Sequence, residues 1–393
     1  MVALVRGGAG LRAAARKFGV SHNTVKFWVE RARGRRLDRV DWSERRRGPR
    51  MPANKTPSQQ EELVLNLRRQ LKQHSDLGEC GAQAIRDELL ARGQDQPPST
   101  RTIARILERR GAVDHRYRVR RPPPPPGWYL PEVAAGRAEL DSFDIVEGLV
   151  IKGGPDVEVL NAKSLHGDLA ASWPREKMVA KTVISCLLQH WRQCGLPSYV
   201  QFDNDTRFQG PHNYPDTVGR VIRVCLSLAV VPVFAPPRET GFQAAIENFN
   251  GQWQQKVWRR FRHASLADLI LRSDKYIAAH RRRATTRNAE ASIRESFPEG
   301  WRFRLTQSPR GKIIFLRRTS ETGAVRLLGR DFMVDAVWLH RLVRAEVDLN
   351  AETIRFYALR RRDPSQQPLL KEVHYALPKP ISKKWSAIAD TLS

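Results

Sequence analysis

Two acidic residues stand at positions where carboxylates can converge. Asp203 follows the apolar run 199–202, which is typical of a short β-strand. Glu247 lies beyond a loop rich in proline and glycine, in a segment whose apolar residues have helical spacing. An acid at a strand end and an acid on a later helix can together hold Mg²⁺, which prefers few protein carboxylates. Two such ions, about 3.5–4 Å apart, would stabilise both the attacking and the leaving oxygen of a phosphodiester.

A third acid for such a site lies upstream. Residues 138–146 are predicted to form a strand, and Asp144 lies within it among strand-forming residues. Asp141 competes for the same role, but an odd spacing along a strand places the two acids on opposite faces. Only one of them can face the metal, and we prefer Asp144 because Phe143, Ile145 and Val146 surround it with strand-forming residues. Asp141 is left as the alternative, with Asp168 in a predicted turn and Glu147 as weaker candidates.

The trio Asp144, Asp203 and Glu247 resembles the Asp-Asp-Glu core of the retroviral-integrase superfamily of transposases and integrases. The most specific pieces are Phe-Asp-Asn-Asp at 202–205 and the run Pro-Pro-Arg…Gly…Ile-Glu-x-Phe-Asn between 236 and 250. In overall layout the chain is most similar to bacterial insertion-sequence transposases. The resemblance implies an RNase H-like fold, in which the three acids would be the catalytic residues and the ligands of two Mg²⁺ or Mn²⁺ ions.

Two features depart from that family pattern. The family usually has Asp-Asn-Gly at the second acid, whereas Asp205 replaces the glycine here and adds an acid beside the expected metal site. Glu247 follows Asp203 by 44 positions, which is more than is usual in the superfamily. The longer interval predicts an insertion at about residues 209–219.

Composition points to a polyanionic partner. The chain has 393 residues and a formal net charge of +27, and the basic surplus occurs in every part and is heaviest at the N-terminal end. The four cysteines are scattered and form no C-x₂-C pair, so neither a disulfide framework nor a zinc knuckle is expected. No signal peptide or apolar run near 18 residues is found, which predicts a cytoplasmic protein without a membrane partner.

The N-terminal residues 1–34 have the pattern of a helix-turn-helix module. Helices are predicted over 11–18 and 23–33, with Gly19 in the turn and Ser21 as the cap of the second helix. The residues expected on its outer side, where they could reach base edges or phosphates, are Ser21, His22, Asn23, Lys26 and Arg31. An ordinary helical hairpin is the alternative, and the charge surplus favours DNA binding.

A second module is predicted after a basic linker. The linker covers residues 35–56, and the second helix-turn-helix module covers residues 57–111. Its last helix, predicted over 99–110, follows a clear start signal. Further candidate DNA contacts are Arg101, Thr102 and Arg105 on this helix, and Arg238 and Lys256 beside the acids.

The rest of the chain completes a multidomain protein with an all-α N-terminal part. Residues 112–136 form a Pro-rich linker, and residues 137–296 form the α/β, RNase H-like integrase core with the order β-β-β-α-β-α-β-α. Residues 311–377 contain short predicted strands and glycine turns, which favour a small C-terminal β-barrel. Residues 378–393 are predicted to be a tail.

These expectations describe a Mg²⁺-dependent DNA transposase. It would bind transposon-end DNA, cleave it with metal-activated water, and join the 3′-hydroxyl ends to target DNA by strand transfer. Joining two ends implies a homo-oligomer on double-stranded DNA, with a partner ATPase as a possible helper. The alternatives are a catalytically silent DNA-binding regulator or target selector derived from a transposase, and a structure-specific nuclease on the same fold. The sequence specifies neither the transposon-end sequence nor the target preference.

Overall fold

The computed structural model describes residues 1–43, 56–113, 125–211, 215–291 and 294–378. These residues fall into two compact units, Met1–Glu62 and Leu63–Ser393. Most of the predicted basic linker, residues 114–124 of the Pro-rich linker, and nearly all of the predicted tail lie outside the described residues. None of the helices in the described part of the chain combines the length and the apolar character that crossing a bilayer requires.

The N-terminal unit has the predicted helix-turn-helix. Its helical elements are α1 (Val2–Arg6), α2 (Leu11–Phe18), α3 (His22–Arg31) and the 3₁₀ turn η1 (Leu37–Arg39). Gly19 ends α2 with a left-handed φ of 63°, and the hydroxyl of Ser21 accepts the backbone N–H of Thr24 to cap α3, as predicted. Fully buried Val25 packs between the helices against Ala14.

A three-helix module follows. Its helices are α4 (Ser58–His74), α5 (Ala82–Ala91) and α6 (Thr100–Arg109), close to their predicted ranges. Fully buried Ile85 and Ile103 pack with Leu67 in the small core that joins the three helices. Ser99 caps α6 through the backbone N–H of Thr102.

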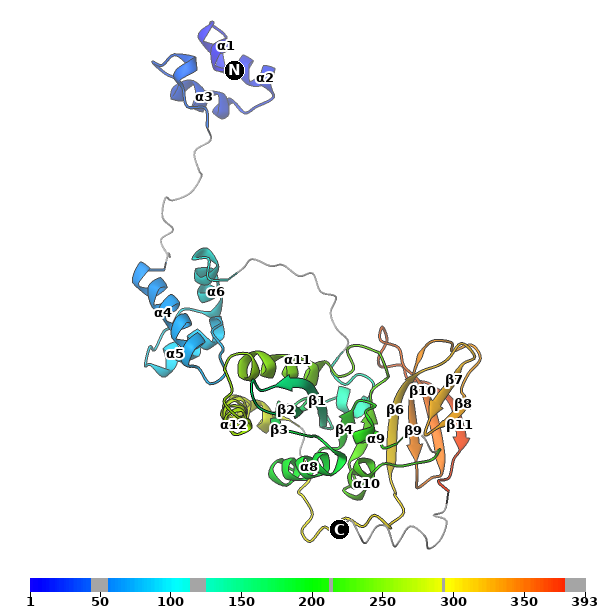
Figure 1. Ribbon diagram of the computed structural model, residues 1–393. Helices are drawn as coiled ribbons and strands as arrows, with labels where there is room; N and C mark the ends of the chain where they lie inside the picture. Colours follow the sequence, from blue (N-terminus) through cyan, green and yellow to red (C-terminus); the bar gives the residue numbers. More distant parts are fainter. Residues whose placement is uncertain (44–55, 114–124, 212–214, 292–293, 379–393) are drawn as a thin grey trace. The chain divides into compact units, whose positions relative to one another are not determined.

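The core has the predicted order of strands and helices, with the short helix α9 added after β4 and the helices α12 and α13 added after α11 (Figure 1). Its strands are β1 (Leu140–Val150), β2 (Asp156–Ser164), β3 (Ala170–Arg175), β4 (Tyr199–Phe202) and β5 (Val231–Phe234). The helices between and after them are α8 (Ala180–Cys194), the short α9 (Thr206–Gln209), α10 (Arg220–Ser227), α11 (Ala244–Trp253) with a π-helical turn at Gln254–Trp258, α12 (Leu266–Arg283) and α13 (Thr285–Glu290).

The sheet of the core is mixed. The antiparallel strands β1, β2 and β3 are followed by β4, which pairs with β1 in parallel, and by β5, which pairs with β4 in parallel. Helices α8 and α10 cover one face of this sheet, and α11 and α12 pack against the β1–β3 part from the other side (Figure 1). The two sides of β1 therefore meet different helices.

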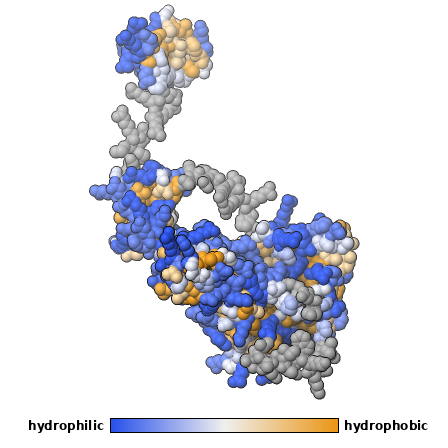
Figure 2. Space-filling model, viewed as in Figure 1, coloured by the Kyte–Doolittle hydropathy of each residue, from blue (hydrophilic) through white to orange (hydrophobic). Residues whose placement is uncertain are grey.

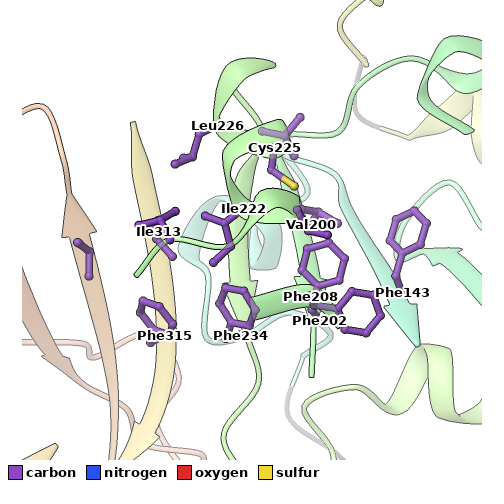
Figure 3. Packing of buried hydrophobic residues seen from close by; sticks show 14 of the residues in the cluster. Phe143, Val200, Phe202, Phe208, Ile222, Cys225, Leu226, Phe234, Ile313 and Phe315 are labelled. Carbon is purple, nitrogen blue, oxygen red and sulfur yellow. The ribbon is translucent and has the colours of Figure 1, made fainter. Parts of the chain in front are cut away.

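Aromatic side chains fill the core on the α8 and α10 side of the sheet. Phe202 stacks on Phe208 at 4.7 Å between ring centroids, and Phe234 stacks on Phe315 at 5.2 Å. Figure 3 shows these rings in one continuous layer with Phe143 of β1. The layer runs across β1, β4, β5 and the next strand of the sheet, so the α/β core and the C-terminal strands share one apolar interior.

The C-terminal strands continue the core sheet. They are β6 (Lys312–Arg318), β7 (Ala324–Leu327), β8 (Arg330–Met333), β9 (Leu342–Asp348), β10 (Thr353–Ala358) and β11 (Leu369–His374). Strand β6 pairs in parallel with β5, and the nine-stranded order is β11-β10-β9-β6-β5-β4-β1-β2-β3, while β7 and β8 form a separate hairpin. The predicted strands are present, but their pairing in the described residues does not confirm a separate small barrel. The periodicity of the sequence predicts strands, but it does not predict which edge of a sheet they join.

The segment before β1, at the end of the Pro-rich linker, is fixed to the core. The short helix α7 (Pro131–Ala134) follows buried Trp128 and Tyr129. The Tyr129 hydroxyl donates to the Phe242 carbonyl at 2.9 Å and accepts from the Gln201 amide at 2.7 Å. These bonds connect the linker to β4 and to the loop before α11.

The predicted insertion packs on the C-terminal strands. Residues 215–219 form an irregular segment before α10, and His212 lies outside the described residues. The Asp216 carboxylate accepts from the Arg330 guanidinium at 2.6 Å and from the Tyr375 hydroxyl at 2.9 Å. Asp216 thus connects this segment to the β7–β8 hairpin and to the residue after β11.

An ion pair with a fully buried carboxylate fixes the segment after α13. The Arg294 guanidinium donates to both oxygens of Asp141 in β1, at 2.9 and 2.6 Å, and the indole N–H of Trp191 donates to the same carboxylate at 3.2 Å. The Asp141 side chain has no exposed surface and that of Arg294 is 9% exposed. Two backbone hydrogen bonds between Leu196 and Glu295 continue this contact.

We predict that Arg294→Gln lowers the free energy of unfolding by about 3–5 kcal/mol, because it leaves the Asp141 charge buried without its cation. Urea unfolding followed by circular dichroism measures the change. Arg326→Gln is the matched control, since its pair with Asp331 is solvent-exposed and contributes little. Equal effects of the two substitutions would contradict the prediction.

Candidate functional site

Three acids reach one region from separate elements. Asp144 lies in β1, Asp203 follows the last residue of β4, and Glu247 lies in the first turn of α11. In the parallel pairing of β1 with β4, Ser142 stands opposite Gln201. Asp144 and Asp203 each lie two residues further along these neighbouring strands, so the register brings them side by side. Glu247 is one turn before Asn250, which contacts Asp144.

The charges of these acids act on one another. The pKa of Asp144 is raised to about 7, first by burial and then by the negative charges of Asp203 and Glu247. The pKa of Asp203 is also raised, again by burial first. Crowded carboxylates with raised pKa values are typical of sites that act on protons or bind cations.

A chain of two asparagines orients Asp144. The Asn250 amide donates to an Asp144 oxygen at 2.6 Å, and the Asn161 amide donates to the Asn250 carbonyl oxygen at 2.8 Å. Asn161 stands directly opposite Asp144 in the antiparallel β1–β2 pair. The sequence patterns did not single out either asparagine as a partner of Asp144. The spacing of Asn250 one turn after Glu247 is the signal that could have revealed its position.

The other acids considered in the sequence have different partners. Asp141 faces α8 and is paired with Arg294, so Asp144 is the β1 acid on the side of α11. Asp168 lies in a turn with a left-handed φ of 59° and pairs with Lys163 at 2.5 Å. Glu147 pairs with Arg207 at 2.6 Å.

The extra acid Asp205 belongs to the turn that carries Asp203. An oxygen of Asp203 accepts the backbone N–H of Asp205 at 3.0 Å, and Asp205 in turn accepts the backbone N–H of Arg207 at 2.7 Å, which caps α9. The Asn204 side chain between them donates to the Ala235 carbonyl and accepts from Arg317, which ties the turn to β5 and β6. Neither of these partners was expected from the sequence.

The chemistry of the three acids suits a hard cation. Carboxylate oxygens are the ligands that Mg²⁺ and Mn²⁺ prefer, and a bound cation would offset the repulsion that raises the Asp144 pKa. Among the described residues, no three His, Cys, Asp or Glu side chains are gathered closely enough to hold a metal as they stand. Glu247 is exposed, so its side chain has room to adjust its position.

The two phosphate contacts predicted beside the acids differ in their surroundings. Lys256 donates to the Gly78 carbonyl at 2.7 Å, in the loop between α4 and α5, and so already has a protein partner. Arg238 is exposed and lies in the loop before α11 with a left-handed φ of 59°. Of the two, Arg238 is the one presented to solvent.

The surface of α3 differs in part from the prediction. His22, Asn23 and Lys26 are exposed as predicted, and Ser21 is exposed while its hydroxyl caps the helix. Arg31 instead pairs with Asp41 at 3.0 Å, and its guanidinium lies 5.1 Å from the centre of the Trp28 ring. The prediction that Arg31 faces outward is wrong, because residues after the helix supply an acid that the pattern of the helix alone does not reveal.

An aromatic residue missed by sequence analysis completes the exposed stripe of α3. The Phe27 side chain is 52% exposed, and it follows Asn23 by one turn and precedes Glu30 by nearly one turn. Figure 2 shows apolar and hydrophilic residues side by side on this unit. The sequence held a sign of this exposure. Phe27 is next to Lys26 and does not share the spacing of Val25, Trp28 and Val29, which are the residues expected to pack inward.

On α6, too, only some of the predicted DNA contacts are exposed. Arg101 and Arg105 are exposed and lie one turn apart on the outer side of the helix. Thr102 is half-buried, and its hydroxyl lies 3.0 Å from that of Ser99. The arginines are therefore available at the surface, whereas the threonine takes part in capping the helix.

Comparison with known proteins gave structural similarities only. No protein-family model matches the chain, and no curated protein matches it. The catalytic core domain of BIV integrase is similar at 17% identity and a TM-score of 0.27, over 34% of this chain and 79% of that chain. The HTLV-2 integrase catalytic core domain in complex with magnesium is similar at 15% identity and a TM-score of 0.27, over 35% of this chain and 81% of that chain. An intasome chain of simian T-cell lymphotropic virus, solved with PP2A regulatory subunit B56 gamma, is similar at 13% identity and a TM-score of 0.33, over 79% of this chain and 99% of that chain.

The raised pKa of Asp144 leads to a prediction about stability. Because the folded protein keeps this proton up to about pH 7 and the unfolded chain loses it near pH 4, stability should fall as pH rises through that window. Asp144→Asn removes the charge while its side-chain oxygen can still accept from Asn250. We expect the variant to gain on the order of 1–2 kcal/mol at pH 8 and little at pH 4.

Thermal unfolding at both pH values, in metal-free buffer, measures this difference. Asp156→Asn at the exposed start of β2 is the control and should behave like the natural protein at each pH. A loss of stability in Asp144→Asn at pH 8 would show that the carboxylate is not under electrostatic strain.

Proposed function

We propose that this protein is a DNA transposase of the retroviral-integrase superfamily, of the bacterial insertion-sequence type. It would bind transposon-end DNA, cut it by hydrolysis, and join the freed 3′-hydroxyl ends to target DNA. The observation that supports the proposal is the register of the parallel strands β1 and β4, which puts Asp144 and Asp203 on neighbouring strands, together with Glu247 one turn before Asn250, whose amide donates to Asp144. The element order of the core and the net charge of +27 support it.

The three acids are proposed to hold two divalent cations. When bound, Mg²⁺ or Mn²⁺ supplies Lewis-acid activation of the attacking oxygen and offsets charge on the reacting phosphate. Asp144 is held for this task by Asn250, which is itself held by Asn161. Asp203 is held by the backbone N–H of Asp205. Glu247 on α11 completes the set and keeps the freedom of an exposed side chain.

DNA is proposed to contact both helical modules and the core. The exposed residues His22, Asn23 and Lys26 of α3, with Phe27, form a surface that fits a major groove. Arg101 and Arg105 of α6 present a second basic surface, and Arg238 presents a cation near the acids. Two ends must be joined in one reaction, so we expect more than one copy of the chain to act together on DNA, with or without an ATPase partner.

The first test of catalysis uses the purified full chain, an end-derived duplex, a supercoiled target plasmid and Mg²⁺. Glu247→Gln, Asp203→Asn and Asp144→Asn should each lower end cleavage and strand transfer by about 10²-fold or more, because each removes a metal-binding charge. Gel analysis of joined products measures the loss. Glu299→Gln, an exposed acid after α13, is the control and should retain full activity.

Other results of that assay separate the alternatives. Cleavage without joining in the natural protein would favour a structure-specific nuclease. Tight binding to DNA with neither product would favour a regulator or target selector, unless an added ATPase fraction restores joining. Full activity in any of the three acid variants would remove that residue from the proposed site.

The second test concerns α3 and uses a duplex selected from a random library by the full chain. Lys26→Ala should reduce the slope of log affinity against log salt by about 0.9, as expected for one lost phosphate contact. Phe27→Ala should leave the slope unchanged but lower the preference for the selected sequence about 5- to 10-fold, as expected for one lost base contact. Fluorescence anisotropy at several salt concentrations measures both quantities. Unchanged binding in both variants would show that α3 does not face DNA.

A further inference from the structure

An arginine lies at the centre of a second group of carboxylates, beside the proposed metal ligands. One terminal nitrogen of the Arg207 guanidinium is 2.6 Å from Glu147 Oε1 and 2.6 Å from Asp205 Oδ2, and its Nε is 2.9 Å from Asp205 Oδ1. The other terminal nitrogen is 3.4 Å from Glu158 Oε1. These three acids come from β1, β2 and the turn after β4.

The geometry of this group is fixed by the backbone. The Asp205 carboxylate caps α9 by accepting the backbone N–H of Arg207, and it also accepts from the Arg207 guanidinium. The two residues therefore form one compact unit. The second oxygen of Glu158 accepts the backbone N–H of Met178. The Arg207 and Asp205 side chains are 20% and 25% exposed, so water screens their charges only in part.

The charges of this unit act on Asp203. Asp203 accepts the backbone N–H of Asp205 at 3.0 Å, and both oxygens of the Asp205 carboxylate are bound by the Arg207 guanidinium, so one negative and one positive charge lie beside the Asp203 carboxylate. Asp205 and Arg207 therefore act on the same carboxyl group with opposite signs. Asp205 adds a negative charge two residues from Asp203, and Arg207 is placed to cancel it.

We propose that Arg207 is a positioning residue that cancels the charge of Asp205, and so keeps divalent cations bound at Asp203 from being held too tightly. The inference rests on the proposed function, in which Asp203 is a metal ligand. In this proposal Arg207 and Asp205 do not bind the cations directly, but their charges affect how tightly Asp203 binds them. Its basis is the bidentate contact between Arg207 and Asp205 and their shared turn with Asp203.

The proposal predicts the signs of three changes in cation affinity. Arg207→Gln leaves the Asp205 charge uncompensated, so Mn²⁺ should bind about 3- to 10-fold more tightly at moderate salt. Asp205→Asn keeps the capping oxygen but removes the charge, so Mn²⁺ should bind more weakly by a similar factor. The double variant has the formal charge of the natural pair and should bind Mn²⁺ nearly as the natural protein does.

The experiment titrates Mn²⁺ into the full chain and counts free ions by electron paramagnetic resonance, which needs no catalytic turnover. Arg207→Lys retains the charge without the planar fork and should bind Mn²⁺ within about twofold of the natural protein. If Arg207 only holds the turn in shape, Arg207→Gln and Arg207→Lys should both weaken binding. Weaker or unchanged Mn²⁺ binding in Arg207→Gln would overturn the inference.

Asp203→Asn separates failure of the inference from failure of the proposed function. If this variant and the natural protein bind Mn²⁺ equally, Asp203 is not a ligand, and both the inference and the proposed metal site are wrong. If Asp203→Asn loses Mn²⁺ while Arg207→Gln gains none, only the inference is wrong. Circular dichroism of each variant verifies that the turn variants remain folded.

Discussion

Electrostatic repulsion between partly buried carboxylates is the constraint that shapes the region around Asp144, Asp203 and Glu247. Asp144 carries a pKa near 7 because burial and the charges of Asp203 and Glu247 disfavour its ionised form. The fold must therefore hold the acids together against their own repulsion. It does so with the parallel pairing of β1 and β4 and with the packing of Ile246, Phe249 and Trp253 of α11 against the sheet. The cost of crowding is offset by apolar burial elsewhere.

Much of the fold was readable from the sequence because its signals are local. The strands around Asp144 and Asp203 and the cap at Ser21 depend on residue type and spacing within a few positions, and the structure has them close to their predicted ranges. The alternation of strand faces predicted that Asp141 and Asp144 point to opposite sides, and the strand-forming residues around Asp144 favoured it; in the structure Asp141 is paired with Arg294 on the side of α8. The joint role of the three acids remains a proposal.

What the sequence did not reveal depends on contacts between distant segments. Arg31 pairs with Asp41, and the β6 strand joins the edge of β5, and neither contact follows from the periodicity of its own segment. The Asn161–Asn250–Asp144 chain requires the β1–β2 register, which one extra residue would shift to the opposite face. The position of Arg207 requires three acids that are 2, 49 and 60 residues away in the sequence.

The parallel pairing of β6 with β5 has a consequence for how the protein can be divided. Since β5 lies between β4 and β6, removing the C-terminal strands would leave the backbone N–H and C=O groups of β5 unpaired along one side. Other chains can add a strand to such an open edge. Removing Phe315 of β6 would also uncover the Phe234 ring that stacks on it. A fragment cut before residue 311 is thus a poor isolated domain, prone to self-association. The boundary between core and C-terminal region marks a change in sequence pattern within a single folding unit.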